Sequence, residues 1–215
     1  MGIDIPITSS SVPDYLHGRN SKNNAVEELR NLIGDCRRCE LYKSRTSIVF
    51  GEGSLQARLV FIGEGPGKEE DKAGKPFVGE AGKLLTRIIE NGMGLKRSDV
   101  YICNVVKCRP PGNRDPETQE INACIPFLKR QLEIIKPEVI CTLGRIAAQQ
   151  LIAADFKITA ERGKWRSFMD IPLMPTYHPA YILRNPSRER ELKGLVWKDI
   201  REIMERLGLE VKNDG

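Results

Sequence analysis

The chain has 215 residues, of which 40% are hydrophobic and 29% charged, and its formal net charge is +5. This size and composition are typical of one soluble domain with a stable core, and no apolar run reaches the roughly 20 residues that a membrane-spanning helix needs. The N-terminal sequence lacks the basic and apolar regions of a secretory signal, so we expect a cytoplasmic protein, and the mild positive charge allows a nucleic-acid partner without requiring one.

The hydrophobic pattern predicts helices that alternate with strands. Residues 1–22 are polar and rich in Ser, Pro and Asn, which indicates a flexible N-terminal arm, and residues 209–215 follow a domain of residues 23–208 as a C-terminal tail. The expected helices cover residues 24–33, 79–91, 115–135, 144–154 and 185–207. The expected strands cover residues 58–63, 100–106, 138–143 and 173–177. This alternation predicts a single α/β domain, in which a central four-stranded parallel sheet is flanked by helices on both faces.

Residues of unusual type follow the predicted strands. A glycine-rich turn, Gly63 to Gly67, comes after the first strand, Asn104 ends the second, and His178 follows the fourth. Ligands bind beyond the carboxyl ends of the strands in parallel sheets, so we expect a binding site at this edge. The glycine-rich turn alone is a weak signal, and it is not a P-loop because no Gly-Lys-Ser/Thr follows it.

The six cysteines need an explanation other than disulfides, because the expected compartment is reducing. Four of them have the spacing of metal ligands: Cys36, Cys39, Cys108 and Cys124. Four thiolates suit a structural zinc ion or a [4Fe–4S] cluster, and the wide spacing of the second pair favours the cluster. Cys103 and Cys141 each lie inside an apolar strand, which predicts two buried thiols without a metal role.

Three motifs occur in a fixed order together with these four cysteines: GEGPGKEEDKAGKPFVGEAGKLL, NVVKCRPPGNRDP and YHPAYILRNP. They resemble the family 4 uracil-DNA glycosylases of bacteria and archaea, over about residues 30 to 205. The resemblance implies a parallel sheet of four strands and a structural [4Fe–4S] cluster on the four cysteines. It also implies an enzyme that flips uracil out of DNA and hydrolyses its N-glycosidic bond, leaving an abasic site.

The resemblance also implies which side chains would recognise uracil. His178 would donate a hydrogen bond to uracil O2 as negative charge builds there. The amide of Asn104 offers one donor and one acceptor, which match O4 and N3–H of uracil and mismatch cytosine. Phe77 would stack on the flipped base, and the backbone of Gly65 and Gly67 would contact uracil or phosphate.

Further roles concern water and DNA. Glu64 is the candidate that positions or activates the attacking water, although the best-known uracil-DNA glycosylases have an Asp where this chain has Gly65. The segment from Tyr181 to Arg184 would probe the minor groove, and Arg188 would contact phosphate. Three cations near the cysteines are further candidates for phosphate contacts: Lys107, Arg109 and Arg114. We expect uracil-containing DNA as the partner of a monomeric protein.

Two alternatives stay open at this point. One is a glycosylase for another deaminated base, and the other is a non-catalytic iron–sulfur protein that binds DNA or carries electrons. A pure binding module would not need the combination of Asn104, Phe77 and His178. Related glycosylases that become covalently joined to DNA use an extra histidine after the second strand, and residues 107–116 contain none.

Overall fold

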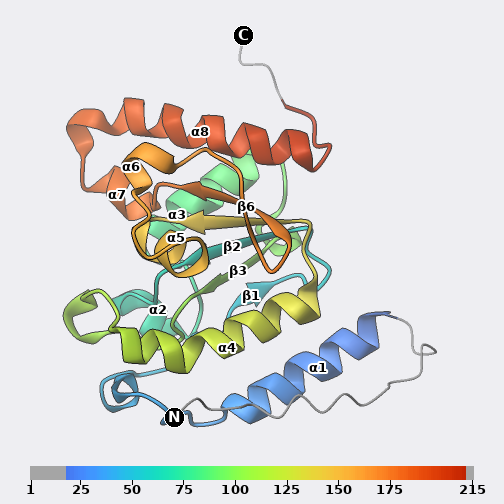
Figure 1. Cartoon of the computed structure of the whole chain (residues 1–215), viewed down its shortest axis with the longest axis vertical. Coiled ribbons are helices and arrows are strands. Elements are labelled where there is room, and N and C mark those ends of the chain that lie inside the picture. The colour runs from blue at the N-terminus through green and yellow to red at the C-terminus, as the bar shows by residue number, and fades with distance from the viewer. Residues whose placement is uncertain (1–17, 212–215) are drawn as a thin grey trace.

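The structure is a computed structural model that describes residues 18–211, with a mixed sheet at its centre (Figure 1). Its strands are β1 (Glu52–Gly53), β2 (Leu59–Gly63), β3 (Tyr101–Asn104), β4 (Val139–Leu143), β5 (Arg166–Phe168) and β6 (Ile171–Thr176). The strand order is β1-β3-β2-β4-β6-β5, and the four central strands are parallel, whereas β1 and β5 pair antiparallel at the two edges. The α/β class is confirmed, and the four predicted strands correspond to the four parallel ones, but the sheet has two further edge strands that the sequence did not predict.

The parallel strands are mostly apolar because both faces of the sheet are covered. Every residue of β2, β3 and β4 is buried. Strands of this kind have continuous apolar runs rather than an alternating pattern, which is why the sequence located them well. Cys103 and Cys141 lie buried inside β3 and β4, as predicted.

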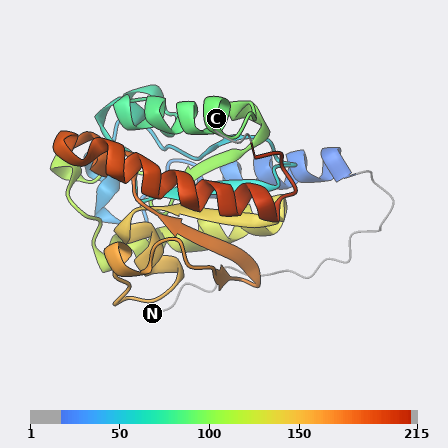
Figure 2. The same ribbon diagram turned by 90° about the horizontal axis from the view of Figure 1, so that it is seen from above.

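Helices form a layer on each face of the sheet. One face carries α3 (Glu80–Arg87), α7 (Pro179–Leu183) and α8 (Glu189–Arg206). The other carries α4 (Thr118–Ile135) and α5 (Arg145–Leu151), with α1 (Gly18–Ile33) packed outside α4. Figure 1 shows α8 and α4 on opposite sides of the sheet, and in Figure 2 α3 and α8 run next to each other over the same face. Among the helices within residues 18–211, none combines the length and hydropathy required to cross a bilayer.

The first helix is longer than its periodicity indicated. It begins at Gly18 rather than residue 24, so the boundary of the expected arm at residue 22 was wrong, and residues 1–17 of that arm lie outside the described residues. Lys22 explains part of the difference, because its ammonium group donates to the backbone oxygens of Leu55 (3.1 Å) and Ile135 (2.8 Å). These long-range hydrogen bonds stabilise the first turns of α1, which the hydrophobic pattern did not predict because their residues are polar.

Several short elements were not expected from the sequence. They are α2 (Lys68–Ala73), α6 (Ile158–Glu161), α7 and a 3-10 turn at Pro186–Arg188 that precedes α8. The last helix therefore begins at Glu189 instead of residue 185. Of the expected C-terminal tail, residues 212–215 lie outside the described part of the chain.

Candidate active site

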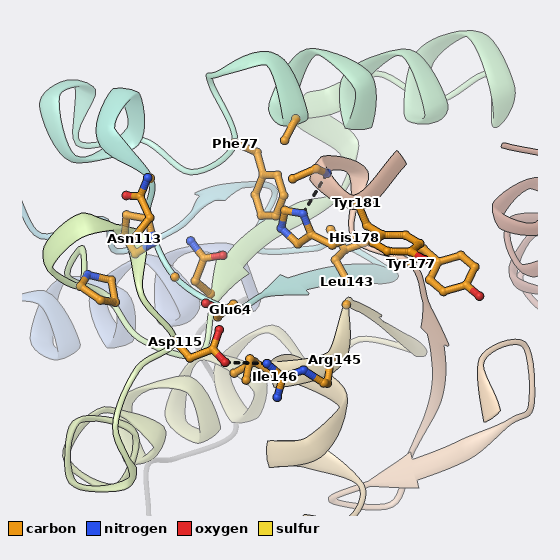
Figure 3. A pocket seen from close by; sticks show the side chains of 18 of the residues that line it. Glu64, Phe77, Asn113, Asp115, Leu143, Arg145, Ile146, Tyr177, His178 and Tyr181 are labelled. Atoms are coloured by element: carbon orange, nitrogen blue, oxygen red, sulfur yellow. Dashed lines mark hydrogen bonds and ion pairs between the residues drawn. The ribbon is translucent and has the colours of Figure 1, made fainter. Parts of the chain in front are cut away.

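A pocket of about 480 Å³ opens at the carboxyl ends of β2, β3, β4 and β6 (Figure 3). Most of the predicted site residues line it: Glu64, Gly65, Gly67, Phe77, Asn104, His178, Tyr181 and Arg184. The structure therefore brings these residues together at the carboxyl edge of the sheet, as the sequence predicted. Arg188 is not part of the lining, and it lies exposed before α8 in an ion pair with Glu191 (2.8 Å).

His178 enters the pocket from the turn between β6 and α7. Its Nδ1 accepts a hydrogen bond from the backbone N–H of Ala180 at 3.0 Å and so caps α7. In the neutral ring the proton is therefore on Nε2, which is left as a donor. Burial, together with the positive charge of Arg184, lowers the pKa of His178 to about 4. The imidazole is thus a neutral hydrogen-bond donor over the physiological pH range.

Phe77 lies against His178 in a stacked arrangement. The two ring centroids are 5.5 Å apart, with an angle of 29° between the ring planes. Phe77 has a positive φ of 51°, and its backbone crosses α3 at Gly82, where a Cβ atom would lie 2.0 Å from the Phe77 carbonyl. A strained conformation of this kind is kept when the surrounding structure fixes it, and here Gly82 provides the space.

Glu70 holds the segment that carries Phe77. Its carboxylate accepts hydrogen bonds from the backbone N–H groups of Gly67 (3.1 Å), Val78 (2.9 Å) and Gly79 (2.9 Å). It therefore joins the glycine-rich turn after β2 to the loop beyond Phe77. Sequence reasoning missed this role, although an acidic residue three positions after a helix cap is a known signal for such contacts.

Asn104 ends β3 beneath the Phe77 ring. Its side chain is 1% exposed, and its Oδ1 has no hydrogen-bond partner among the described residues. A Cβ atom at Gly63 would lie 2.5 Å from this Oδ1 and 2.6 Å from the Phe77 ring, so glycine is required for the amide and the ring to approach each other. A buried oxygen without a donor costs about 1–3 kcal/mol, so Oδ1 is available to accept a hydrogen bond from a group that enters the pocket.

Glu64 lies on the opposite wall from His178, near Asp115 and Arg145 (Figure 3). Burial and the charge of Asp115 raise the pKa of Glu64 to about 7. Asp115 itself pairs with Arg145 at 2.5 Å. The helix expected over residues 115–135 begins only at Thr118, with Glu117 as its cap, and Asp115 instead lines the pocket.

The four cysteines with ligand spacing line a second, smaller hollow: Cys36, Cys39, Cys108 and Cys124. None of them forms a disulfide, and the remaining wall is largely apolar, with Ile33, Leu41, Ile48 and Phe127. Across residues 18–211, no three His, Cys, Asp or Glu side chains converge on the position of a single ion. The donor set is therefore four thiols around one shared space, with no oxygen or imidazole ligand in the lining.

Positive groups surround this hollow. Arg38 donates to the sulfur of Cys36 (3.3 Å), Arg45 donates to that of Cys108 (3.8 Å), and the backbone N–H of Lys107 donates to that of Cys124 (3.2 Å). Burial is the main cause that raises the pKa of Cys108 to about 12 and that of Cys124 to about 11, against the opposing charges of Arg45 and Lys107. Such thiols ionise when a metal centre binds them, and the surrounding cations then offset the thiolate charge.

The cations expected near phosphate differ in their positions. Arg114 lines the pocket, and Arg109 donates to Asn113 (2.7 Å) on its rim. Lys107 is only 2% exposed, so it cannot reach DNA and its assignment to a phosphate patch was wrong.

Comparisons with known proteins identify the family of the chain. The model of the uracil DNA glycosylase superfamily matches residues 50–201. The chain is 48% identical over 182 residues to the type-4 uracil-DNA glycosylase of Thermotoga maritima, covering 81% of this chain and 92% of the relative. It is 48% identical to that of Saccharolobus solfataricus (82% and 86%) and 46% identical to that of Sulfurisphaera tokodaii (84% of each). With nearly half its residues shared over most of both lengths, the chain belongs to the type-4 family of the uracil-DNA glycosylase superfamily.

Proposed function

We propose that the protein removes uracil from DNA by hydrolysing the bond between the base and deoxyribose. The observation that carries this proposal is the meeting of an amide, an aromatic ring and a neutral imidazole in one pocket, from Asn104, Phe77 and His178. The pocket is recessed at the edge of the sheet, so a base must leave the double helix to enter it. The product is an abasic site in DNA.

Base selection follows from the unsatisfied amide of Asn104. Its free Oδ1 accepts the N3–H of uracil, while its amide nitrogen donates to O4. Cytosine has an acceptor at N3 and a donor at N4. The Asn104 oxygen would therefore face an acceptor, and its amide nitrogen would face a donor. A buried site of this kind rejects the wrong partner strongly because its polar groups would stay unpaired. Phe77 holds the plane of the base by stacking.

Bond cleavage places negative charge on the departing uracil and positive character on the sugar. His178 donates from Nε2 to O2 as this charge develops, and its hydrogen bond from Ala180 fixes the ring in the required orientation. Since the imidazole is already neutral, no proton needs to be lost before it acts. The Glu64 carboxylate positions the water that attacks the sugar carbon and stabilises the positive sugar.

Uracil release should rise with pH through about 7, because Glu64 acts only as a carboxylate. Its raised pKa of about 7 means that the group is largely protonated at pH 6 and largely ionised at pH 8. Glu64→Gln should lower the rate by about 10²-fold or more and remove this rise. Single-turnover cleavage between pH 5.5 and 9 provides the measurement. If the variant keeps the wild-type pH profile, another group is responsible for it.

The rim of the pocket supplies DNA contacts. Arg184 lines the rim, and the neighbouring Leu183 is 39% exposed, which is unusual for a large apolar side chain. An exposed apolar side chain at this place fits insertion into the gap that uracil leaves in the base stack. Tyr181 belongs to the same short helix, α7. We propose that the monomer binds DNA through this segment, with Arg184 near phosphate and Arg188 released from Glu191 on binding.

We further propose that the four cysteines hold a [4Fe–4S] cluster. The four-thiol donor set, the apolar wall and the nearby cations fit this group. When bound, the cluster supplies cross-links between segments that are distant in sequence, and the cleavage itself requires no redox step. A four-thiolate zinc site has the same donors, and the metal and sulfide content of the purified protein distinguishes the two.

Gly63→Ala should lower uracil release by about 10-fold or more. The new Cβ atom would contact both the Asn104 oxygen and the Phe77 ring, and a displacement of about 1 Å at a reactive site has effects of this size. Gly194→Ala in α8 is the matched control, because nothing lies within 4 Å of the added atom there. The kcat/KM of both variants tests this prediction, and equal values would contradict it.

Cleavage of oligonucleotides that carry one modified base tests the proposed function as a whole. A strand break after alkali treatment should occur with uracil and not with thymine or cytosine. Including hypoxanthine and xanthine separates this function from that of a glycosylase for another deaminated base. Binding of the uracil oligonucleotide without base release would indicate a non-catalytic DNA-binding protein and overturn the proposal.

A further inference from the structure

Lys107 is a buried lysine between the pocket and the cysteine hollow. Only 2% of it is exposed, although lysine is rarely buried without a charged partner. Its ammonium group donates to the backbone oxygen of Asn104 (2.8 Å) and to the side-chain oxygen of Gln131 in α4 (2.6 Å). Both acceptors are neutral, and none of the ion pairs within residues 18–211 includes Lys107.

The same residue contacts the cysteine hollow. Lys107 is part of its lining, and its backbone N–H donates to the sulfur of Cys124 at 3.2 Å. A centre of four thiolates around a zinc ion or a [4Fe–4S] cluster has a net charge of about −2. Such a centre would supply the negative partner that the buried ammonium group of Lys107 otherwise lacks.

Backbone contacts connect this charge to the base-binding residues. The carbonyl of Lys107 accepts from Val49 (2.8 Å), and the turn before it is fixed by Val105 N–H donating to Gly63 (2.9 Å) and Val106 N–H donating to Glu64 (3.0 Å). The ammonium group closes the same turn from inside, through the carbonyl of Asn104. A shift of Lys107 would therefore change the position of Asn104 relative to Gly63.

We infer that Lys107 is the internal counter-ion of the four-thiolate centre and a positioning residue for Asn104, so that loading of the centre aligns the base-binding amide. The inference deepens the proposed function and rests on it for the role of Asn104. It gives the metal centre a direct part in base recognition without any redox step. Gln131 completes the arrangement, because its amide nitrogen donates to Phe50 (2.9 Å) and to the Tyr101 hydroxyl (3.1 Å) and so fixes its oxygen toward Lys107.

Lys107→Met tests the charge. The variant keeps most of the unbranched side chain and removes the ammonium group, so it should lose metal to a chelator at least 10-fold faster than the wild type. Lys22→Met is the matched control, because the Lys22 ammonium group also donates to two oxygens, both of them on the backbone, but lies outside the linings of both the pocket and the hollow. The control should lose metal within 2-fold of the wild-type rate. Equal rates for Lys107→Met and wild type would overturn the counter-ion role.

Gln131→Leu tests the positioning and serves if Lys107→Met does not fold. It removes an acceptor of Lys107 but no charge, so it should retain metal while inhibition by free uracil weakens at least 5-fold. Unchanged inhibition by uracil would overturn the positioning role. Metal retention is measured without substrate, so the counter-ion role can be tested even if the wild type releases no uracil. Absence of uracil release by the wild type would refute the proposed function but not the counter-ion role.

Discussion

Replacing His178 with alanine should lower the rate of uracil release by about 10²- to 10³-fold, the usual effect of removing one preorganised donor from a developing anion. The change removes the Nε2–H group that faces the pocket, whereas Phe77 and Asn104 keep their own supports at Gly82 and β3. DNA affinity should therefore stay within a few-fold of wild type. Single-turnover cleavage and titration with an uncleavable uracil analogue measure the two quantities separately.

The pH dependence distinguishes His178 from Glu64. With a pKa lowered to about 4, the imidazole is neutral above pH 5, so its loss should reduce the rate by a similar factor from pH 6 to pH 9. The rise through pH 7 should persist in His178→Ala, because it belongs to Glu64. His178→Gln, which keeps a side-chain N–H, should regain part of the rate. Wild-type release by the alanine variant would remove the proposed role of the imidazole.

Replacing Cys108 with serine should give a colourless protein that unfolds at a lower temperature. A structural metal centre contributes folding free energy directly, and for a chain of this size each kcal/mol lost lowers the Tm by about 2–4 °C. Loss of one of four ligands removes several kcal/mol, so the Tm should fall by about 10 °C or more. The visible spectrum, the iron and sulfide content and a thermal unfolding curve are the measurements.

Cys103→Ala is the control for this experiment. Its thiol is buried in β3 and lies outside the hollow, so the variant should keep its colour and metal and lose only a small amount of stability. If Cys108→Ser retains iron and colour like this control, the assignment of the four ligands is wrong.

The sequence predicted the centre of the fold better than its edges, for physical reasons. A strand covered on both faces needs apolar residues throughout, and the run at residues 58–63 therefore located β2 within one residue. The edge strands β1 and β5 have only two and three residues, most of them polar and none of them fully buried. Such short segments have no hydrophobic periodicity that distinguishes them from loops. Their pairing depends on partners far along the chain.

The same distinction applies to the site. Asn104 and His178 were found because they lie next to strand ends, where parallel topology brings them together. Phe77 lies beyond α2, away from any strand end, and only the family resemblance pointed to it. Lys107 was grouped with Arg109 and Arg114 in a phosphate patch, which needs an exposed side chain, as lysine usually has. Its burial depends on Gln131, which arrives on a helix 24 residues later and supplies the missing acceptor. Asp115 is of a residue type that commonly caps helices, so the sequence did not indicate a place in the pocket wall. That place depends on its ion pair with Arg145, which is 30 residues away in the chain.

A structure of the protein soaked with free uracil tests the central claim most directly. The account predicts one uracil in the 480 Å³ pocket, stacked on Phe77, with its O4 and N3 edge on the Asn104 amide and its O2 within hydrogen-bond distance of His178 Nε2. A base bound elsewhere, or bound in the pocket with that edge turned away from Asn104, would contradict it.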